Sequence, residues 1–312
     1  MHGVPLDLDD VRARARAAFL GFAVGDALGA PVEFLTAAEI RARGVHREMT
    51  GGGWLHLKPG RVTDDTEMAL CVARALVEEG GFSLRAIADR LAEWVKRGPI
   101  DVGNTCRRGL RAYIVEGRLE APPGEWDAGN GAAMRVLPVA LRTLGDFDLL
   151  GGWAVAQGHL THNHPLSDAG SVLFGKLLQV AVMGLPLARM RAECDALAAV
   201  HRAFAFDPWR GGCTGYVADS VRLVLHHFFR SRGFEECLVA VVNEGGDADT
   251  NGALAGMLAG ACHGREAIPS RWIRRMDPRL LAELDELALR LAEASPLFTA
   301  RAEAVRLRAC GP

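Results

Sequence analysis

The sequence lacks several patterns that would assign it to a common functional class. It has no cysteine pair at the CxxC spacing, and its cysteine count of seven is odd. Both features favour reduced thiols over a disulfide framework or a zinc site. The formal net charge of the 312-residue chain is only −2, so composition predicts no general attraction to nucleic acid or to an anionic membrane. Neither a GxGxxG nor a GxxxxGKS phosphate-binding motif is present.

Targeting and membrane-spanning segments are also missing from the pattern. The stretch from Met1 to Asp10 is acidic and contains proline, without the basic-then-apolar order of a signal peptide. Charges or glycines interrupt the longest apolar stretches before they reach the length that spans a membrane. We therefore expect a cytoplasmic protein that does not insert into a membrane.

Helical periodicity dominates the chain, and the alternation typical of β-strands is scarce. The expected helices cover residues 10–27, 65–79, 83–95, 104–116, 131–144, 149–161, 167–183, 187–203, 214–230, 234–243, 250–263 and 278–294. This pattern predicts an all-α, compact multi-helix globule. Because no long polar linker interrupts it, we expect one domain over residues 1–312, with a short N-terminal tail at 1–9.

Two short acidic runs are the most informative feature that is present. They are Thr63-Asp64-Asp65-Thr66 and Gly245-Gly246-Asp247-Ala248-Asp249-Thr250. Each precedes an expected helix, so either run alone could be an N-cap. A cap needs one oxygen, however, whereas each run offers three or more. Adjacent carboxylates need compensation, and oxygen ligands of this kind suit Mg²⁺, Mn²⁺ or Ca²⁺ better than Zn²⁺. We therefore predict that the two runs meet around divalent cations.

Longer stretches of the sequence resemble the ADP-ribosylglycohydrolase family. The resemblance rests on GDALGAPVEF (25–34), GGGWL (51–55), VTDDTEMAL (62–70), DVGNTCRRG (101–109), AGNGAAMR (128–135), THNHPLSDA (161–169) and GGDADTNGALAGMLAGA (245–261). The TDDT and GGDADT pair is typical of the whole family. The GGGWL, DVGNTCRRG and THNHPLSD stretches are similar to those of the branch that acts on dinitrogenase reductase.

The resemblance implies a site with two divalent cations, Mn²⁺ being favoured and Mg²⁺ the alternative. The implied metal ligands are Thr63, Asp64, Asp65, Asp247, Asp249 and Thr250. Glu33 and Asp101 are the implied catalytic residues, with Glu33 acting on the ribose or the attacking water. Asp26 would support the site by hydrogen bonding, and His164 would be a structural loop residue. The implied substrate-binding residues are Asn104, Glu125, Gly129, Asn130, Gly131 and His162.

The implied activity is hydrolysis of the bond between ADP-ribose and a modified arginine. Within the resembling branch the substrate is ADP-ribosylated dinitrogenase reductase, whose cleavage reactivates nitrogenase. A PII-type signalling protein and an ammonium transporter are further implied partners, and the second would allow reversible membrane association. Two alternatives remain open: a general hydrolase of ADP-ribosyl-arginine or another ADP-ribose conjugate, and an ADP-ribose binding module without turnover. Retention of all six ligand-type residues, Glu33 and Asp101 argues against the binding module.

Overall fold

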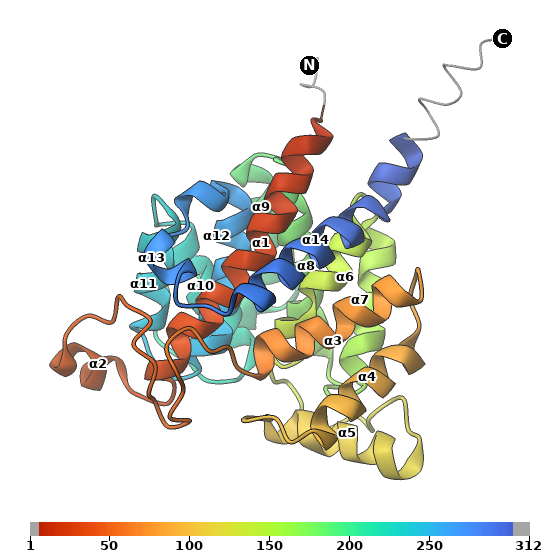
Figure 1. Ribbon diagram of the computed structural model, residues 1–312, viewed down its shortest axis with the longest axis horizontal. Coiled ribbons are helices and arrows are strands. Elements are labelled where there is room, and N and C mark those ends of the chain that lie inside the picture. Colours follow the sequence, from red (N-terminus) through yellow and green to blue (C-terminus); the bar gives the residue numbers. More distant parts are fainter. Residues whose placement is uncertain (1–5, 302–312) are drawn as a thin grey trace.

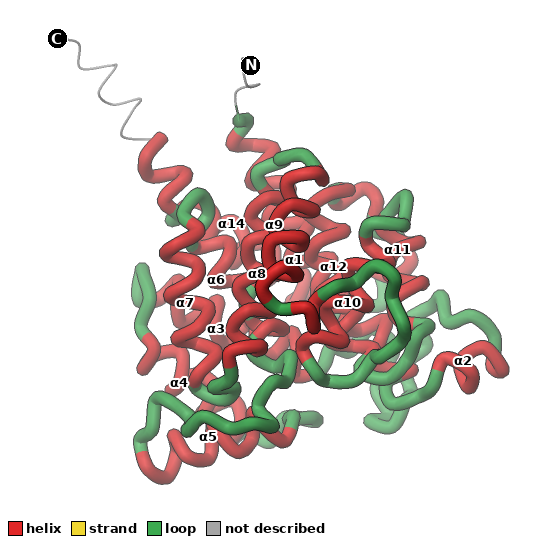
Figure 2. Tube along the Cα trace, turned by 180° about the vertical axis from the view of Figure 1, so that it is seen from behind, coloured by secondary structure: helices red, strands yellow, loops and turns green. Residues whose placement is uncertain are grey.

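The computed structural model describes residues 6–301, and within this range the chain forms helices and loops but no β-strand (Figures 1 and 2). The expected all-α fold is therefore confirmed. The α-helices are α1 (Leu8–Gly29), α2 (Ala37–Arg43), α3 (Asp64–Glu78), α4 (Leu84–Lys96), α5 (Asn104–Glu116), α6 (Leu137–Arg142), α7 (Phe147–His159), α8 (Pro165–Val182), α9 (Leu187–Val200), α10 (Val217–Phe228), α11 (Phe234–Val242), α12 (Ala248–His263), α13 (Ser270–Ile273) and α14 (Pro278–Glu293). Short 3₁₀ turns are η1 (Ala30–Val32), η2 (Ala133–Arg135), η3 (Arg202–Phe204) and η4 (Arg265–Ala267).

Helices α1 and α12 form the centre of the molecule, where they pack against each other in antiparallel orientation (Figure 1). Their contact is made by glycines. A Cβ atom built on Gly25 would lie 1.9 Å from the carbonyl oxygen of Gly252, and one built on Gly256 would lie 2.0 Å from that of Gly21. The two backbones therefore touch directly. The remaining helices pack around this pair and bury one continuous apolar cluster.

Helix α1 is longer than the sequence pattern predicted. It runs through Gly25 and ends at Gly29, because close packing on α12 stabilises glycines that are poor helix formers on their own. It also begins at Leu8, within the expected tail at 1–9; residues 1–5 of that tail lie outside the described range.

The expected helix at 131–144 was wrong in its bounds. The chain instead forms η2, followed by the short α6 that begins at Leu137. Pro138 explains the interruption, because it has no N–H to continue a helix yet is well suited to the first turn of a new one. Helices α2 and α13 were not predicted; both are short.

The expectation that no apolar stretch reaches membrane-spanning length also needs correction. Residues Leu8–Val32 form a helical segment that is long and apolar enough to cross a membrane by length and composition. Its apolar window is 94% buried inside the protein, as in the core helices of proteins that never enter a membrane. Its length reflects its central position in the helix packing.

The packing of α1 on α12 predicts that replacing a glycine at this contact lowers the stability of the fold, whereas replacing a glycine on an open helix surface does not. Gly252→Ala would place a Cβ 2.4 Å from the Gly25 carbonyl oxygen, so we expect the free energy of unfolding to fall by about 1–3 kcal/mol. Gly152→Ala on α7 is the matched control, since no atom lies within 4 Å of the added Cβ. That variant should be as stable as the wild type or more so, because alanine favours helices. Chemical denaturation measures both, and a wild-type midpoint for Gly252→Ala would contradict the contact.

Candidate metal and substrate site

The first acidic run is held in place by a buried carboxylate from α1. Asp26 accepts hydrogen bonds from the backbone N–H of Thr63 (3.0 Å) and of Thr66 (3.1 Å). It also accepts the hydroxyl hydrogens of Thr63 (3.0 Å) and Thr66 (2.5 Å). Asp26 thus caps the N-terminus of α3 from another helix. This supporting role is the one that the sequence indicated for it.

Neither acidic run caps its own helix through the side chain at the N-cap position. Thr63 and Asp247 occupy the N-cap positions of α3 and α12, and neither makes a side-chain capping bond. The Asp64 and Asp65 carboxylates follow Thr63 in the first turn of α3, where the positive end of the helix favours anions. The capping alternative therefore does not account for these residues.

The second run is tied to the loop that carries Glu33. The N–H of Phe34 donates to the Gly246 carbonyl (2.7 Å), and the N–H of Gly246 donates to the Leu35 carbonyl (2.8 Å). Both Gly245 and Gly246 have positive φ, at 73° and 63°. A Cβ on Gly245 would also lie 2.0 Å from the Leu35 carbonyl oxygen. Only glycine fits this turn, which brings Glu33 next to the second run.

Both runs line one cavity of about 690 Å³. Carboxylate oxygens of Glu33, Asp247 and Asp249 all lie within 4.8 Å of one another there. Two runs separated by most of the sequence therefore meet, as predicted. The acidic residues that line the cavity are Glu33, Asp64, Asp65, Asp101, Asp247 and Asp249.

Burial and mutual repulsion raise the pKa values of these carboxyl groups. Burial is the main cause for Glu33, whose pKa rises to about 8, with further contributions from the charges of Asp247, Asp101 and Asp64. Burial, and then the charge of Asp101, raises the pKa of Asp64 to about 7. Burial, and then the charges of neighbouring carboxylates, raises the pKa values of Asp65 and Asp249 well above the usual value. A divalent cation would offset this repulsion.

The donor set fits a hard divalent cation. The two acidic runs and Glu33 present carboxylate and hydroxyl oxygens to the cavity, the ligands that Mg²⁺ and Mn²⁺ prefer. Oδ1 of Asp65 is buried without a hydrogen-bond partner, and such an orphaned acceptor calls for a partner that the protein itself does not provide. Thr250 also lines the cavity, whereas Thr63 is not among its lining residues. The Thr63 hydroxyl lies within hydrogen-bond distance of Asp26 and Asp65, and its oxygen can still accept a cation, so its expected role as a ligand stays a prediction.

Glu33 is oriented by Trp54 of the GGGWL stretch. The indole Nε1–H donates to Glu33 Oε2 at 2.6 Å, and both side chains line the cavity. Sequence reasoning used Trp54 only as part of a motif and missed this contact. Asp101 also lines the cavity, where its Oδ1 accepts the N–H of Val102 at 2.7 Å. Burial raises the pKa of Asp101, which favours its protonated form.

His162 is buried in the cavity wall as a neutral hydrogen-bond donor. The buried Arg135 donates to Oγ1 of Thr161 (2.8 Å), so the Thr161 hydroxyl hydrogen is available to Nδ1 of His162 at 2.8 Å. Nδ1 then accepts, and Nε2 carries the imidazole hydrogen. Burial and the charges of Arg135 and Arg108 lower the His162 pKa to about 3, which keeps the ring neutral.

The ring of His162 lies so close to Gly129 and Gly131 that a side chain at either position would clash with it. A Cβ on Gly131 would lie 2.6 Å from His162 Cε1, and a Cβ on Gly129 would lie 2.9 Å from Nε2. These glycines therefore give the imidazole access to the cavity, a reason that the sequence did not reveal. They precede the 3₁₀ turn η2, so the expected helix N-terminus at residue 131 is absent. Asn130 donates to Asp247 Oδ2 at 2.6 Å and so orients the second acidic run.

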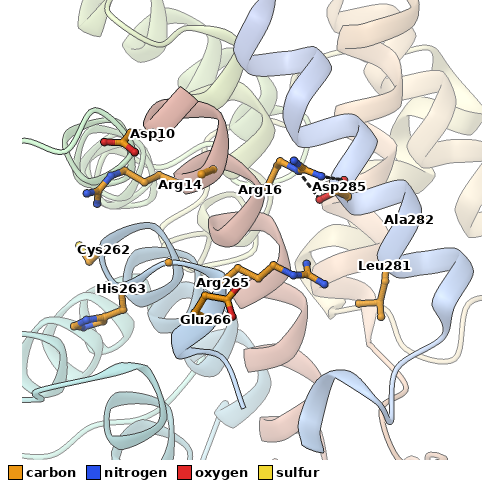
Figure 3. A pocket seen from close by; sticks show the side chains of 12 residues that line it. Asp10, Arg14, Arg16, Cys262, His263, Arg265, Glu266, Leu281, Ala282 and Asp285 are labelled. Atoms are coloured by element: carbon orange, nitrogen blue, oxygen red, sulfur yellow. Dashed lines mark hydrogen bonds and ion pairs between the residues drawn. The ribbon is translucent and has the colours of Figure 1, made fainter. Parts of the chain in front are cut away.

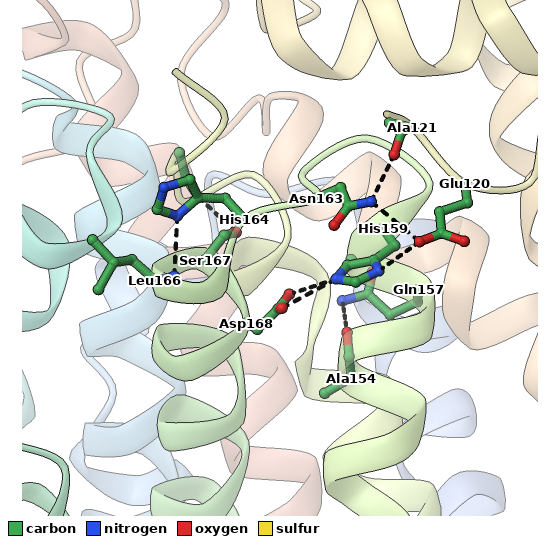
Figure 4. Close-up of polar contacts among 12 residues, drawn as sticks. Glu120, Ala121, Ala154, Gln157, His159, Asn163, His164, Leu166, Ser167 and Asp168 are labelled. Atoms are coloured by element: carbon green, nitrogen blue, oxygen red, sulfur yellow. Dashed lines mark hydrogen bonds and ion pairs between the residues drawn. The ribbon is translucent and has the colours of Figure 1, made fainter. Parts of the chain in front are cut away.

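The segment after His162 is fixed by local polar contacts (Figure 4). Asn163 Nδ2 donates to the carbonyl of Ala121 at 2.7 Å, and Nδ1 of His164 accepts the N–H of Leu166 at 3.0 Å. His164 is the N-cap of α8, consistent with a structural role.

Of the other predicted substrate residues, Asn104 lines the cavity at the start of α5, whereas Glu125 does not. Glu125 is exposed on the loop before Asp127, in a proline-containing segment whose side chains face water. The structure therefore does not bring it together with the remaining predicted site residues.

A second cavity, of about 770 Å³, lies at the other end of α1 between the end of α12 and α14 (Figure 3). Arg16 pairs there with Asp285 at 2.5 Å, and Arg14 donates to the carbonyl of Ala261 at 3.1 Å. Its lining includes none of the predicted site residues. The cavity between the acidic runs is thus the candidate functional site.

The fold and this site define a class: an all-helical protein with a carboxylate-lined cavity suited to divalent cations. The chain belongs to the ADP-ribosylglycohydrolase family, because the model of that family matches residues 7–299. It is 51% identical over 275 residues to the ADP-ribosyl-[dinitrogen reductase] glycohydrolase of Rhodospirillum rubrum, and the aligned region covers 88% of this chain and 94% of the relative. It is 32% identical over 284 residues to an ADP-ribosylarginine hydrolase of Pseudomonas putida, covering 84% of this chain and 74% of the relative. A solved structure described as an ADP-ribosylglycohydrolase-related protein complex matches with a TM-score of 0.82 and 36% identity, covering 92% of this chain and 99% of the other.

The raised pKa values predict how pH affects the stability of the cation-free protein. Glu33 and Asp64 have folded-state pKa values of about 8 and about 7, above those of an unfolded chain. The folded state therefore holds protons that the unfolded state has released, so this contribution is full below about pH 4 and is lost as pH rises toward 8. After chelation, we expect the melting temperature to fall between about pH 5.5 and 8.5. Added Mn²⁺ or Mg²⁺ should raise it more at the higher pH, where protons compete less with the cation.

The control for this prediction is Asp65→Asn, measured after the same chelation. Removing one charge from the cluster should flatten the fall in melting temperature, because the remaining carboxylates repel each other less. A wild-type melting temperature that is independent of both pH and cation over this range would contradict the electrostatic account.

Proposed function

We propose that this chain hydrolyses the bond between ADP-ribose and a modified arginine of dinitrogenase reductase. The observation that carries the proposal is the 51% identity to the Rhodospirillum rubrum glycohydrolase across nearly the full length of both chains. The cavity supports it, since both acidic runs, Glu33 and Asp101 line one site. On this proposal, the protein restores the activity of a modified nitrogenase component.

Two divalent cations, Mn²⁺ or alternatively Mg²⁺, would be held by Thr63, Asp64 and Asp65 on one side and by Asp247, Asp249 and Thr250 on the other. When bound, such cations polarise substrate oxygens and offset developing negative charge. Glu33 belongs to the same carboxylate cluster, so it would lie beside a ribose held by these cations. Trp54 holds Oε2 of Glu33, which leaves Oε1 to accept a hydrogen bond from a ribose hydroxyl or the attacking water.

Asp101 is the residue best suited to protonate the departing arginine. A guanidine is strongly basic, so it must leave in protonated form. Asp101 lines the cavity without being part of either acidic run, and its raised pKa favours a carboxyl group that can give up a proton. Its Oδ1 is held by Val102, which leaves Oδ2 for this transfer.

The ADP portion of the substrate would contact the wall formed by His162, Gly129, Gly131 and Asn104. The neutral His162 offers its Nε2–H to a phosphate or ribose oxygen, while the glycines leave space beside the ring. Asn104 adds a side-chain amide at the same wall. These groups recognise the substrate by hydrogen bonding and leave charge compensation to the cations.

A general ADP-ribosyl-arginine hydrolase is the second candidate function. It is favoured by the 32% identity to the Pseudomonas putida ADP-ribosylarginine hydrolase, since the two candidates share chemistry and differ only in the protein that carries the arginine. With the first candidate function, we expect a cytoplasmic location and regulation through a PII-type protein and an ammonium transporter. A binding module without turnover is the least supported, because a carboxyl suited to proton transfer is present beside the acidic cluster.

Direct assay tests the function. We expect incubation with ADP-ribosylated dinitrogenase reductase and Mn²⁺ to release ADP-ribose and to restore unmodified arginine, as read by mass spectrometry of the peptide. Asp247→Ala is the matched control: it removes a carboxylate from the cluster, so cation affinity and hydrolysis should fall together. Cleavage of an unrelated ADP-ribosylated protein at an equal rate would favour the general hydrolase, and binding without release would favour the module.

Asp101→Asn separates substrate binding from chemistry. The variant keeps the acidic runs intact, so the affinities for cation and ADP-ribose should match the wild type. The single-turnover rate should fall by about 10²-fold or more, the usual contribution of a general acid. Calorimetry measures the binding and rapid quenching the rate. An unchanged rate would remove Asp101 from the mechanism, and lost cation binding would make it a ligand instead.

A further inference from the structure

Exposed apolar side chains lie on the cavity wall of the candidate site or on segments that adjoin its lining residues. Phe34 and Trp54 line the cavity, yet 65% and 48% of their surfaces remain exposed. Ile100, 47% exposed, directly precedes Asp101 in the cavity wall. Tyr216 is exposed too and lies across a backbone bridge from Gly129, another lining residue. Trp126, three residues before Gly129, is 88% exposed. We call these five residues the rim surface.

Phe34 shows that this exposure is enforced by the backbone. Its φ of +62° is uncommon for a residue with a side chain and carries a cost in free energy. Its N–H bonds to the Gly246 carbonyl, which fixes this conformation next to the second acidic run. The ring projects into water and contacts Trp54, with 5.3 Å between ring centroids. Backbone strain that keeps an aromatic ring exposed brings no gain in folding, so it indicates a role in contact with another molecule.

The loop that carries Trp126 is also held by polar contacts. Its neighbour Asp127 is buried and forms an ion pair with Arg108 of α5. The backbone of the next residues is also paired, since Val217 donates to the carbonyl of Ala128 at 2.9 Å. A nearly fully exposed tryptophan on a fixed loop is an unusual use of the largest apolar side chain. Tryptophan and tyrosine are the residues that most often dominate binding energy in protein interfaces.

We propose that the rim surface is a docking site for the folded protein that carries the modified arginine, an inference that rests on the proposed function. The occupant follows from continuity with the site. The cavity carries six carboxylate side chains and would take the ADP-ribose and the arginine tip. The protein surface around that arginine must then lie against the exposed residues of the cavity wall and its surroundings, where the apolar rim surface stands beside the polar side chains of Asn104, Arg107 and Thr214. The partner is therefore a protein with an apolar patch beside its modified arginine.

A comparison of two substrates tests this inference on the full-length chain. The double variant Ile100→Ser/Trp126→Ser removes rim contacts without changing a predicted ligand or catalytic residue. We expect kcat/KM for ADP-ribosylated dinitrogenase reductase to fall by about tenfold or more, a loss typical of interface tryptophans. With free ADP-ribosyl-arginine, which reaches only the cavity, kcat/KM should equal that of the wild type. Phe34→Asn, which keeps a residue tolerant of positive φ, should also lower kcat/KM for the modified protein.

The matched control is Val115→Ser/Val200→Ser. These valines are 71% and 75% exposed on α5 and α9, and neither lines the cavity, so both substrates should be cleaved at wild-type rates. Unchanged kcat/KM of the rim variant with the modified protein would overturn the docking site. So would an equal loss with both substrates, which would indicate a structural effect, or a changed oligomeric state in size-exclusion chromatography, which would make the rim a contact between copies. Inactivity of the wild type toward both substrates would instead contradict the proposed function.

Discussion

The direct contact between the α1 and α12 backbones is the constraint on which the rest of the structure depends. At Gly25 and Gly252 no side chain separates the two helices. This contact aligns the end of α1, which carries Asp26, with the start of α12, which carries Asp249. Since Asp26 caps α3, one helix pair positions both acidic runs. Widening the pair by the radius of a methyl group would move the two halves of the site relative to each other.

Such rigidity is needed because the site gathers charges that repel. Burial and neighbouring carboxylates raise the pKa values of Glu33 and Asp64, which means that the fold holds these groups together against an electrostatic cost. Flexible loops would separate them. The structure instead places them at helix starts and at a glycine turn with backbone hydrogen bonds on both sides, as at Gly245 and Gly246. Cation binding would then stabilise an arrangement that already exists, with little reorganisation.

The sequence predicted the all-α fold and most helix positions, because apolar periodicity is a local signal. It failed where tertiary contacts override local preference, as at Gly29, which α1 includes beyond its predicted end at residue 27, or where a proline begins a new helix, as at Pro138. The glycine spacing at 21, 25 and 29 and at 252, 256 and 260 was visible, and it could have predicted that two helices pack closely. Which helices pair cannot be read from either series alone.

For the site, the sequence predicted which residue types gather but not how each is used. The Thr63 hydroxyl, for example, lies within hydrogen-bond distance of Asp26, a residue of another helix, so this contact cannot be read from the acidic run alone. The tautomer of His162 depends on Arg135, a residue known only as part of a motif. The cavity and the rim surface also differ in their side chains, which are carboxylates in the first and apolar groups in the second. On the proposed function, the carboxylate-lined cavity binds the ADP-ribose group, which many proteins carry when modified. Selection among those proteins would then depend on contacts outside the cavity, such as those of the exposed apolar side chains of the rim surface.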